Sequence, residues 1–228
     1  MSVNKKNVTP GLPFTAARLA AGKPVHIVLY GDSISEVGRT PNYFGGATCR
    51  DKNWGERLGA LLGRRYRHAR FRVSHFAIGG QNAYEGLGRL DWLTALKPDL
   101  VLIEFGANDC GWHFIPPAAT GLAVGSLVEG IRARTSADVV IVIPGGDNPQ
   151  SPTMRHLDQT LRALRRTAAV RQSPVVDVRA AILRATQNGR HWTAYHNGLQ
   201  DCHPNDRGHA VWAQAACAAI CACPATRA

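Results

Sequence analysis

A histidine near the end of the chain stands among residues that can support proton transfer. It is His203, in the stretch "LQDCHPNDRGHAVWAQAACAAI" at 199–220. Asn205 or Asp206 accounts for the start of a helix, because one capping side chain is enough there, but neither accounts for the histidine. An imidazole can act as a general base, and a carboxylate just upstream, Asp201, can orient its ring. The pattern therefore predicts an acid-base loop ahead of a closing helix.

Three polar, glycine-containing turns offer the partners that such a base needs. The turn "YGDSIS" displays Ser33, which is either a nucleophile or a helix cap, two readings that this stretch alone leaves even. The turns "IGGQN" and "FGANDCGWHF" offer the backbone N–H of Gly80 and the side-chain amide of Asn108. Each of these is alone an ordinary turn residue. Together with His203, they predict an oxyanion hole beside a serine nucleophile.

The elements that must bring these turns together are short apolar strands that alternate with amphipathic helices. We expect strands at 25–31, 71–79, 99–106, 138–146 and 174–178, and helices near 54–67, 83–96, 120–134, 153–171 and 207–221. Such alternation is typical of a parallel sheet covered on both faces. We therefore expect an α/β fold, a doubly wound three-layer α/β/α sheet of about five strands, with ligands beyond the carboxyl ends of the strands. We expect residues 1–22 to be a lead-in segment and residues 23–228 to form a single domain.

The composition is that of a folded globular chain. Of the 228 residues, 45% are apolar and 19% are charged. No signal peptide is visible, and no stretch reaches the roughly eighteen apolar residues that span a bilayer. We expect a soluble protein that is cytoplasmic, or exported with its signal removed. The six cysteines leave their pairing open, including a pair between Cys110 and Cys202, and the oligomeric state is open too.

The chain is strongly basic. Its net charge is +11, from 27 Lys and Arg against 16 Asp and Glu, and the run "RRYRHARFR" at 64–72 supplies much of it. Such a run can hold nucleic acid or an anionic glycan, but it is more often a solvated helix end and loop. Because no zinc finger, RNP motif or heptad-linked basic region accompanies it, the sequence disfavours a nucleic-acid partner.

Four motifs in order, "GDSIS", "IGGQNAYEGLGRL", "GAND" and "HPNDRGH", resemble the four sequence blocks of the SGNH (GDSL-type) hydrolases. The resemblance implies a flavodoxin-like fold, with Ser33 as the nucleophile and His203 as the general base. It also implies that the oxyanion donors are the backbone N–H groups of Ser33 and Gly80 and the side chain of Asn108.

One position departs from the family's pattern. The last block usually has an Asp three residues before its His, but Gln200 occupies that position here, and Asp201 is only two residues before His203. Two alternatives stay open. Asp201 completes a catalytic triad, or a backbone carbonyl orients the imidazole and leaves a dyad of Ser33 and His203. We favour Asp201 because it is the only carboxylate close upstream.

The resemblance implies ester hydrolysis through an acyl-enzyme, with no metal and no organic cofactor. Because no long apolar lid is evident, we expect a short acyl group such as acetyl on a carbohydrate, so the partner is a small-molecule or glycan ester. Trp112, His113 and Phe114 follow "GAND" and can stack on a sugar ring, while core packing is an equal alternative for Trp112 and Phe114. The alternative function is a non-catalytic glycan- or nucleic-acid-binding module on the same fold.

Overall fold

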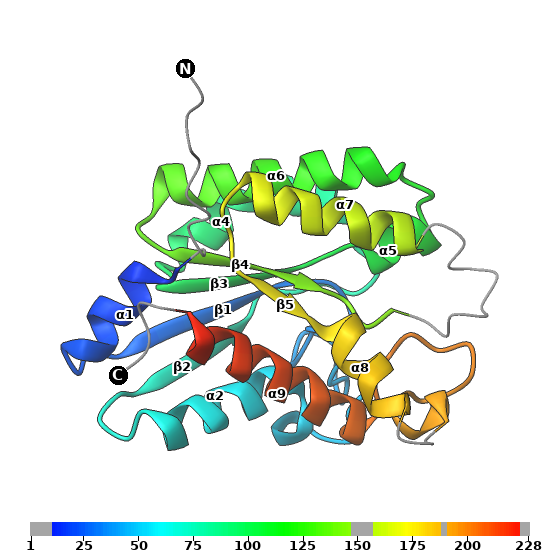
Figure 1. Cartoon of the computed structure of the whole chain (residues 1–228), viewed down its shortest axis with the longest axis horizontal. Coiled ribbons are helices and arrows are strands. Elements are labelled where there is room, and N and C mark those ends of the chain that lie inside the picture. The colour runs from blue at the N-terminus through cyan, green and yellow to red at the C-terminus, as the bar shows by residue number, and fades with distance from the viewer. Residues whose placement is uncertain (1–10, 147–156, 188–190, 224–228) are drawn as a thin grey trace.

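Five parallel strands form a sheet at the centre of the chain, in the order β2-β1-β3-β4-β5 (Figure 1). The computed structural model describes residues 11–146, 157–187 and 191–223. The strands are β1 (Val25–Gly31), β2 (Phe71–His75), β3 (Leu100–Glu104), β4 (Asp138–Ile143) and β5 (Val175–Asp177). The expected doubly wound parallel sheet is confirmed.

Helices cover both faces of the sheet, so the molecule has three layers (Figure 1). On one face lie α1 (Pro13–Ala20), α2 (Trp54–Arg65), α8 (Val178–Gln187) and α9 (Asp206–Ala222). On the other lie α3 (Ala83–Leu87), α4 (Leu90–Ala95), α5 (Ala107–Gly111), α6 (Pro117–Arg134) and α7 (Leu157–Val170). Two 3₁₀ turns, η1 (Arg50–Lys52) and η3 (Trp192–Ala194), lie in the connections.

The core divides into two halves because successive side chains of a strand point to opposite faces. In β1, Val25, Ile27 and Leu29 join the cluster under α2 and α9, while Val28 and Tyr30 join the cluster under α3, α4, α6 and α7. Every residue of β1, β3 and β4 is buried. Central strands buried on both faces explain the near-continuous apolar runs in the sequence.

Several elements differ from the sequence-based expectation. The stretch 83–96 divides into α3 and α4, because Gly88 falls between them and glycine is a poor helix former. Within the segment 1–22, helix α1 packs on the sheet with Leu19 buried. The helix expected over 153–171 begins at Leu157 in the described residues. Helix α8 was not expected, and the division of the chain at residue 22 stays a prediction.

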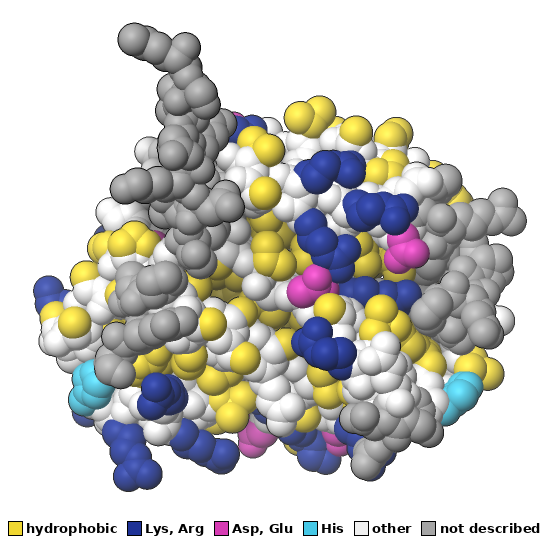
Figure 2. Space-filling view, in the orientation of Figure 1, with side chains coloured by type: hydrophobic (Ala, Val, Ile, Leu, Met, Phe, Trp, Pro, Cys, Tyr) yellow, Lys and Arg dark blue, Asp and Glu magenta, His cyan; other side chains and the backbone are white. Residues whose placement is uncertain are grey.

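Positive charge is spread beyond the basic run at 64–72. Lys and Arg side chains also gather over α7, β5 and α8 on the face shown in Figure 2, and the exposed ones include Arg162, Arg166 and Arg184. None of the helices in the described ranges has both the length and the apolar character that crossing a membrane requires. The cysteines form no disulfide within the described part of the chain.

The chain reverses its winding direction beside β1, whose neighbours β2 and β3 lie on opposite sides. In parallel sheets the ends of such strands enclose a crevice where ligands bind. Gly31 and Glu104 are register partners at these ends. A Cβ on Gly31 would lie 2.4 Å from the Glu104 carbonyl oxygen, so only glycine allows this close approach. The turns that follow β1 and β3 are therefore held side by side.

Candidate functional site

Ser33 lies in the turn after β1, half-buried at the wall of a cavity of about 390 Å³. Asp32 braces the turn, because its Oδ1 accepts the backbone N–H two residues ahead at 3.1 Å. Ser35 anchors the turn to β3, donating from Oγ to Glu104 Oε2 at 2.9 Å. Helix α2, the next α-helix along the chain, is capped by Asn53. Ser33 does not serve as that helix cap, and its hydroxyl faces the cavity.

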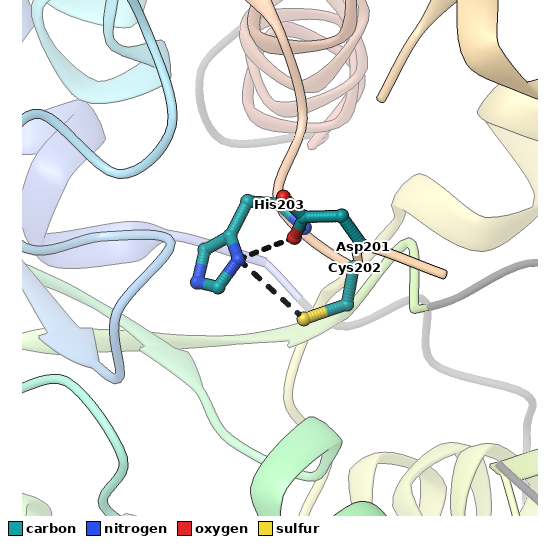
Figure 3. Close-up of side chains that lie close together, drawn as sticks. All are labelled: Asp201, Cys202 and His203. Atoms are coloured by element: carbon teal, nitrogen blue, oxygen red, sulfur yellow. Dashed lines mark hydrogen bonds and ion pairs between the residues drawn. The ribbon is translucent and has the colours of Figure 1, made fainter. Parts of the chain in front are cut away.

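The side chains of Ser33, His203 and Asp201 form a continuous hydrogen-bonded row. The Ser33 Oγ lies 2.8 Å from His203 Nε2, and His203 Nδ1 lies 2.6 Å from Asp201 Oδ1. Figure 3 shows the imidazole turned toward the Asp201 carboxylate. With Nδ1 donating its proton to Asp201, Nε2 carries the lone pair that can accept the serine proton. This arrangement would allow Ser33 to act as a nucleophile, with His203 as its general base and Asp201 as the orienting acid.

A local turn lets the Asp201 carboxylate reach the His203 ring although the two residues are only two positions apart. Asp201 Oδ1 accepts the backbone N–H of His203 at 2.9 Å as well as the ring Nδ1–H. An Asp side chain that accepts the N–H two residues ahead forms an Asx turn. This turn folds the carboxylate back onto the ring of its own near neighbour. The carboxylate, rather than a backbone carbonyl, therefore faces Nδ1.

A second histidine of the same motif fixes the start of α9. His209 is fully buried, accepts the Trp54 N–H at Nδ1 (3.1 Å) and contacts the Gly45 carbonyl oxygen through Nε2 (3.0 Å). Burial lowers the pKa of His209 to about 3, so the ring stays neutral and can hold one bond of each kind. Asn205 caps α9. The loop that carries His203 is thereby fixed relative to α2.

The expected oxyanion donors line the same cavity as Ser33 and His203. Gly80 adopts φ +80°, a conformation that favours glycine. Asn108 begins the turn after β3 as part of α5, and its Nδ2 donates to Gln81 O at 3.0 Å. A longer contact of 3.3 Å joins Asn108 Nδ2 to Asp32 Oδ2. The amide is thus oriented from two sides at the carboxyl ends of β1 and β3.

The three residues after "GAND" occupy different positions. Trp112 lines the cavity and is 80% exposed, and Phe114 is 74% exposed, so core packing of these two rings is excluded. His113 instead contacts the Gly80 carbonyl oxygen through Nε2 at 2.9 Å. His113 therefore holds the Gly80 turn, while Trp112 offers a solvent-exposed ring beside Ser33.

Several cavity residues were not found from the sequence. They are Glu36, Arg39, Thr40, Tyr43, Gly79 and Cys202. The Tyr43 ring lies edge-on to His203, with centroids 6.3 Å apart. Its hydroxyl interacts with Ser33, and burial raises the Tyr43 pKa above its usual value, so the phenol stays protonated. Gly79 and Cys202 are sequence neighbours of the predicted site residues Gly80 and His203. The other four come from the β1–α2 connection, which carries no recognisable motif.

A carboxyl pair lies buried beneath the nucleophile turn. Asp32 is 1% exposed and Glu104 is fully buried. Burial and the neighbouring Asp32 raise the pKa of Glu104 well above its usual range, and burial raises the pKa of Asp32 to about 6. Asp32 accepts the N–H of Ile34 and the amide of Asn108, which favours its charged form. Glu104 is therefore the protonated member, hydrogen-bonded to Asp32. The signal in the sequence was an acid that ends the apolar run "LVLIE".

Comparison with known proteins is consistent with this geometry. Residues 29–211 match the family model described as the GDSL-like Lipase/Acylhydrolase family. No curated protein sequence matches the chain.

Solved structures share the fold at low sequence identity. An acetylxylan esterase from Geobacillus stearothermophilus is 22% identical, with a TM-score of 0.70 over 86% of this chain and 94% of that one. An α/β hydrolase from the metagenome of Lake Arreo, Spain, is 24% identical, with a TM-score of 0.71 over the same shares. A two-domain esterase active on acetylated mannans is 21% identical, with a TM-score of 0.72 over 94% of this chain and 52% of that one. At these identities the likeness shows the fold.

We predict that Glu104→Gln flattens the pH dependence of stability. Glu104 has a raised pKa in the folded protein, so the folded state keeps a proton that the unfolded chain loses, and wild-type stability falls as pH rises from about 4.5 toward 7. Glutamine mimics the protonated acid and cannot titrate. Urea unfolding across this range should show the free energy of unfolding falling with pH in the wild type and changing less in Glu104→Gln.

The control for this prediction is Glu129→Gln, which changes an exposed acid paired with Arg171. Its profile should parallel that of the wild type. If the Glu104→Gln profile also runs parallel to the wild type, the buried pair does not hold a proton.

Proposed function

This chain belongs to the GDSL-like lipase/acylhydrolase family, and from that premise we propose that it is a serine esterase that removes short acyl groups, acetyl above all, from carbohydrates. The observation that carries the proposal is the contact of 2.8 Å between Ser33 Oγ and His203 Nε2. A hydroxyl is a weak nucleophile unless a base takes its proton, and this base is in hydrogen-bonding range.

Acylation begins when Ser33 attacks the ester carbonyl. His203 Nε2 takes the hydroxyl proton, and the imidazolium that forms is stabilised by the Asp201 carboxylate at Nδ1. The carbonyl oxygen becomes an oxyanion, which accepts hydrogen bonds from the N–H groups of Ser33 and Gly80 and from the Asn108 amide. The Asn108 N–H that makes the longer contact of 3.3 Å with Asp32 is the one shared with the oxyanion. Collapse of this intermediate breaks the bond to the alcohol, and His203 gives the alcohol its proton.

Deacylation repeats these steps with water. His203 removes a proton from a water molecule, which attacks the acyl-Ser33 ester, and the same donors hold the second oxyanion. Collapse returns the proton to Ser33 and releases the carboxylic acid. The same three side chains, Ser33, His203 and Asp201, therefore act in both acylation and deacylation.

The size of the cavity supports a short acyl group on a sugar. Its volume of about 390 Å³ lies at the small end of the range for ligand pockets, which favours a short acyl group over a long chain. At the rim, the exposed Trp112 ring can stack on the apolar face of a sugar. The two carbohydrate esterases that share the fold act on acetylated xylan and acetylated mannans. Fragments of acetylated xylan and acetylated mannan are therefore the substrates to test first.

We predict that the purified protein hydrolyses p-nitrophenyl acetate faster than the butyrate and octanoate esters, and that it releases acetate from acetylated xylo- or manno-oligosaccharides. Ser33→Ala should abolish both activities, because loss of a serine nucleophile can lower kcat by about a millionfold. Its unfolding midpoint should match that of the wild type. Equal rates for the two proteins would favour the non-catalytic binding module.

We predict that Asp201→Asn lowers kcat, by an amount that can reach about ten-thousandfold. The amide can keep the local turn through its carbonyl oxygen but cannot stabilise the imidazolium. The matched control is Asp206→Asn, because the Asp206 carboxylate binds Thr48 and Lys52 rather than His203. Steady-state kinetics on p-nitrophenyl acetate should show a large loss only for Asp201→Asn. Similar activity of the two variants would refute the triad role of Asp201.

A further inference from the structure

Three consecutive residues present three different metal-binding atoms to one point. The carboxylate of Asp201, the thiol of Cys202 and the ring of His203 place their ligand atoms within 4.8 Å of one another (Figure 3). His203 Nδ1 is central, 2.6 Å from Asp201 Oδ1 and 3.9 Å from Cys202 Sγ. Among the described residues, these three form the group of at least three His, Cys, Asp or Glu side chains whose ligand atoms lie this close together.

The donor set selects a particular class of cation. Thiolate, imidazole and carboxylate together suit Zn²⁺ and the softer Cd²⁺, whereas Mg²⁺ and Ca²⁺ prefer oxygen ligands alone. Around a tetrahedral Zn²⁺ the ligand atoms lie roughly 3.4 Å apart, which follows from bonds of about 2.0–2.3 Å. The sulfur-to-nitrogen separation of 3.9 Å is near this value. The contact of 2.6 Å between Asp201 Oδ1 and His203 Nδ1 must widen on binding.

The cluster is open to solvent on the side of the cavity. Cys202 and His203 line the cavity, and the Asp201 side chain is 41% exposed. Three protein ligands with access from solvent leave a fourth position for water. The direct sequence "DCH" makes the cluster possible, because the short spacing that brings Asp201 onto the imidazole also places the Cys202 thiol beside it.

We propose that Asp201, Cys202 and His203 form an inhibitory site for a thiol-binding divalent cation, Zn²⁺ or Cd²⁺. Binding releases the Cys202 thiol proton to solvent and requires the lone pair of His203 Nδ1. The neutral ring then carries its proton on Nε2, through exchange with solvent. A protonated Nε2 cannot accept the Ser33 proton, so the bound cation removes the general base. The inhibition rests on the proposed esterase function, whereas the binding does not.

Binding is tested directly with Cd²⁺, whose bond to a thiolate absorbs in the ultraviolet. Titration of the purified protein with Cd²⁺ should give an absorbance band that saturates. At saturation the wild type should bind one more Cd²⁺ per chain than Cys202→Ser does. The control Cys49→Ser, which changes an exposed cysteine away from the cavity, should match the wild type. Equal bands for the wild type and Cys202→Ser would overturn the site.

Inhibition is tested with Zn²⁺ on p-nitrophenyl acetate hydrolysis, with each rate divided by that variant's own metal-free rate. The wild type and Cys49→Ser should be inhibited and should recover with EDTA, and Mg²⁺ should have no effect. Cys202→Ser should need about 10- to 100-fold more Zn²⁺, a loss at least as large as that for an outer-shell partner. Equal sensitivity of Cys202→Ser and the wild type would contradict the site. A Cys202-dependent Cd²⁺ band in a protein without esterase activity would support the site and refute the proposed function.

Discussion

The contact between Ser33 and His203 joins two loops that are 170 positions apart in the sequence, and the rest of the fold determines whether it forms. The parallel pairing of β1 with β3 fixes the position of the Ser33 turn relative to the turn that follows β3. The position of the loop that carries His203 is determined by α9. This helix packs on α2 through Trp54 and Trp212, whose ring centroids lie 5.7 Å apart. Since a misplacement of about 1 Å can cost about a hundredfold in rate, rigid packing at a distance is part of the chemistry.

The sheet and the side chains that meet at the candidate site could be predicted from the sequence because both depend on local signals. Buried strands form apolar runs in the sequence, and Ser33, Gly80, Asn108 and His203 each lie in or beside a glycine- or proline-containing turn. The sequence favoured Asp201 over a backbone carbonyl as the partner of His203 but could not decide between them. The Asx turn that lets Asp201 reach Nδ1 depends on backbone geometry, which the sequence does not show. The residues of the β1–α2 connection were missed since they reach the cavity through long-range folding. Helix α8 was missed because it follows β5 directly, so its first residue falls within the strand expected at 174–178.

The polar groups around Ser33 form a continuous path from the core to the cavity. Ser35 links Trp54 Nε1 to the buried Glu104, and Glu104 shares its proton with Asp32. Asp32 in turn contacts Asn108. A buried carboxylate without such partners would cost several kcal/mol. Here the remaining negative charge, on Asp32, lies beside the Asn108 amide, which is proposed to hold the oxyanion. The contacts that stabilise the buried acids therefore also orient the Asn108 amide.

The most direct measurement is the site of acylation during turnover. The protein is mixed with p-nitrophenyl acetate, quenched in acid within the first turnover, digested and mapped by mass spectrometry. An acetyl group on the peptide that contains Ser33, absent after the substrate is exhausted, is the result expected of a serine acyl-enzyme. An acetyl group on Cys202 instead, or continued turnover with no acylated peptide at any quench time, would contradict Ser33 as the nucleophile.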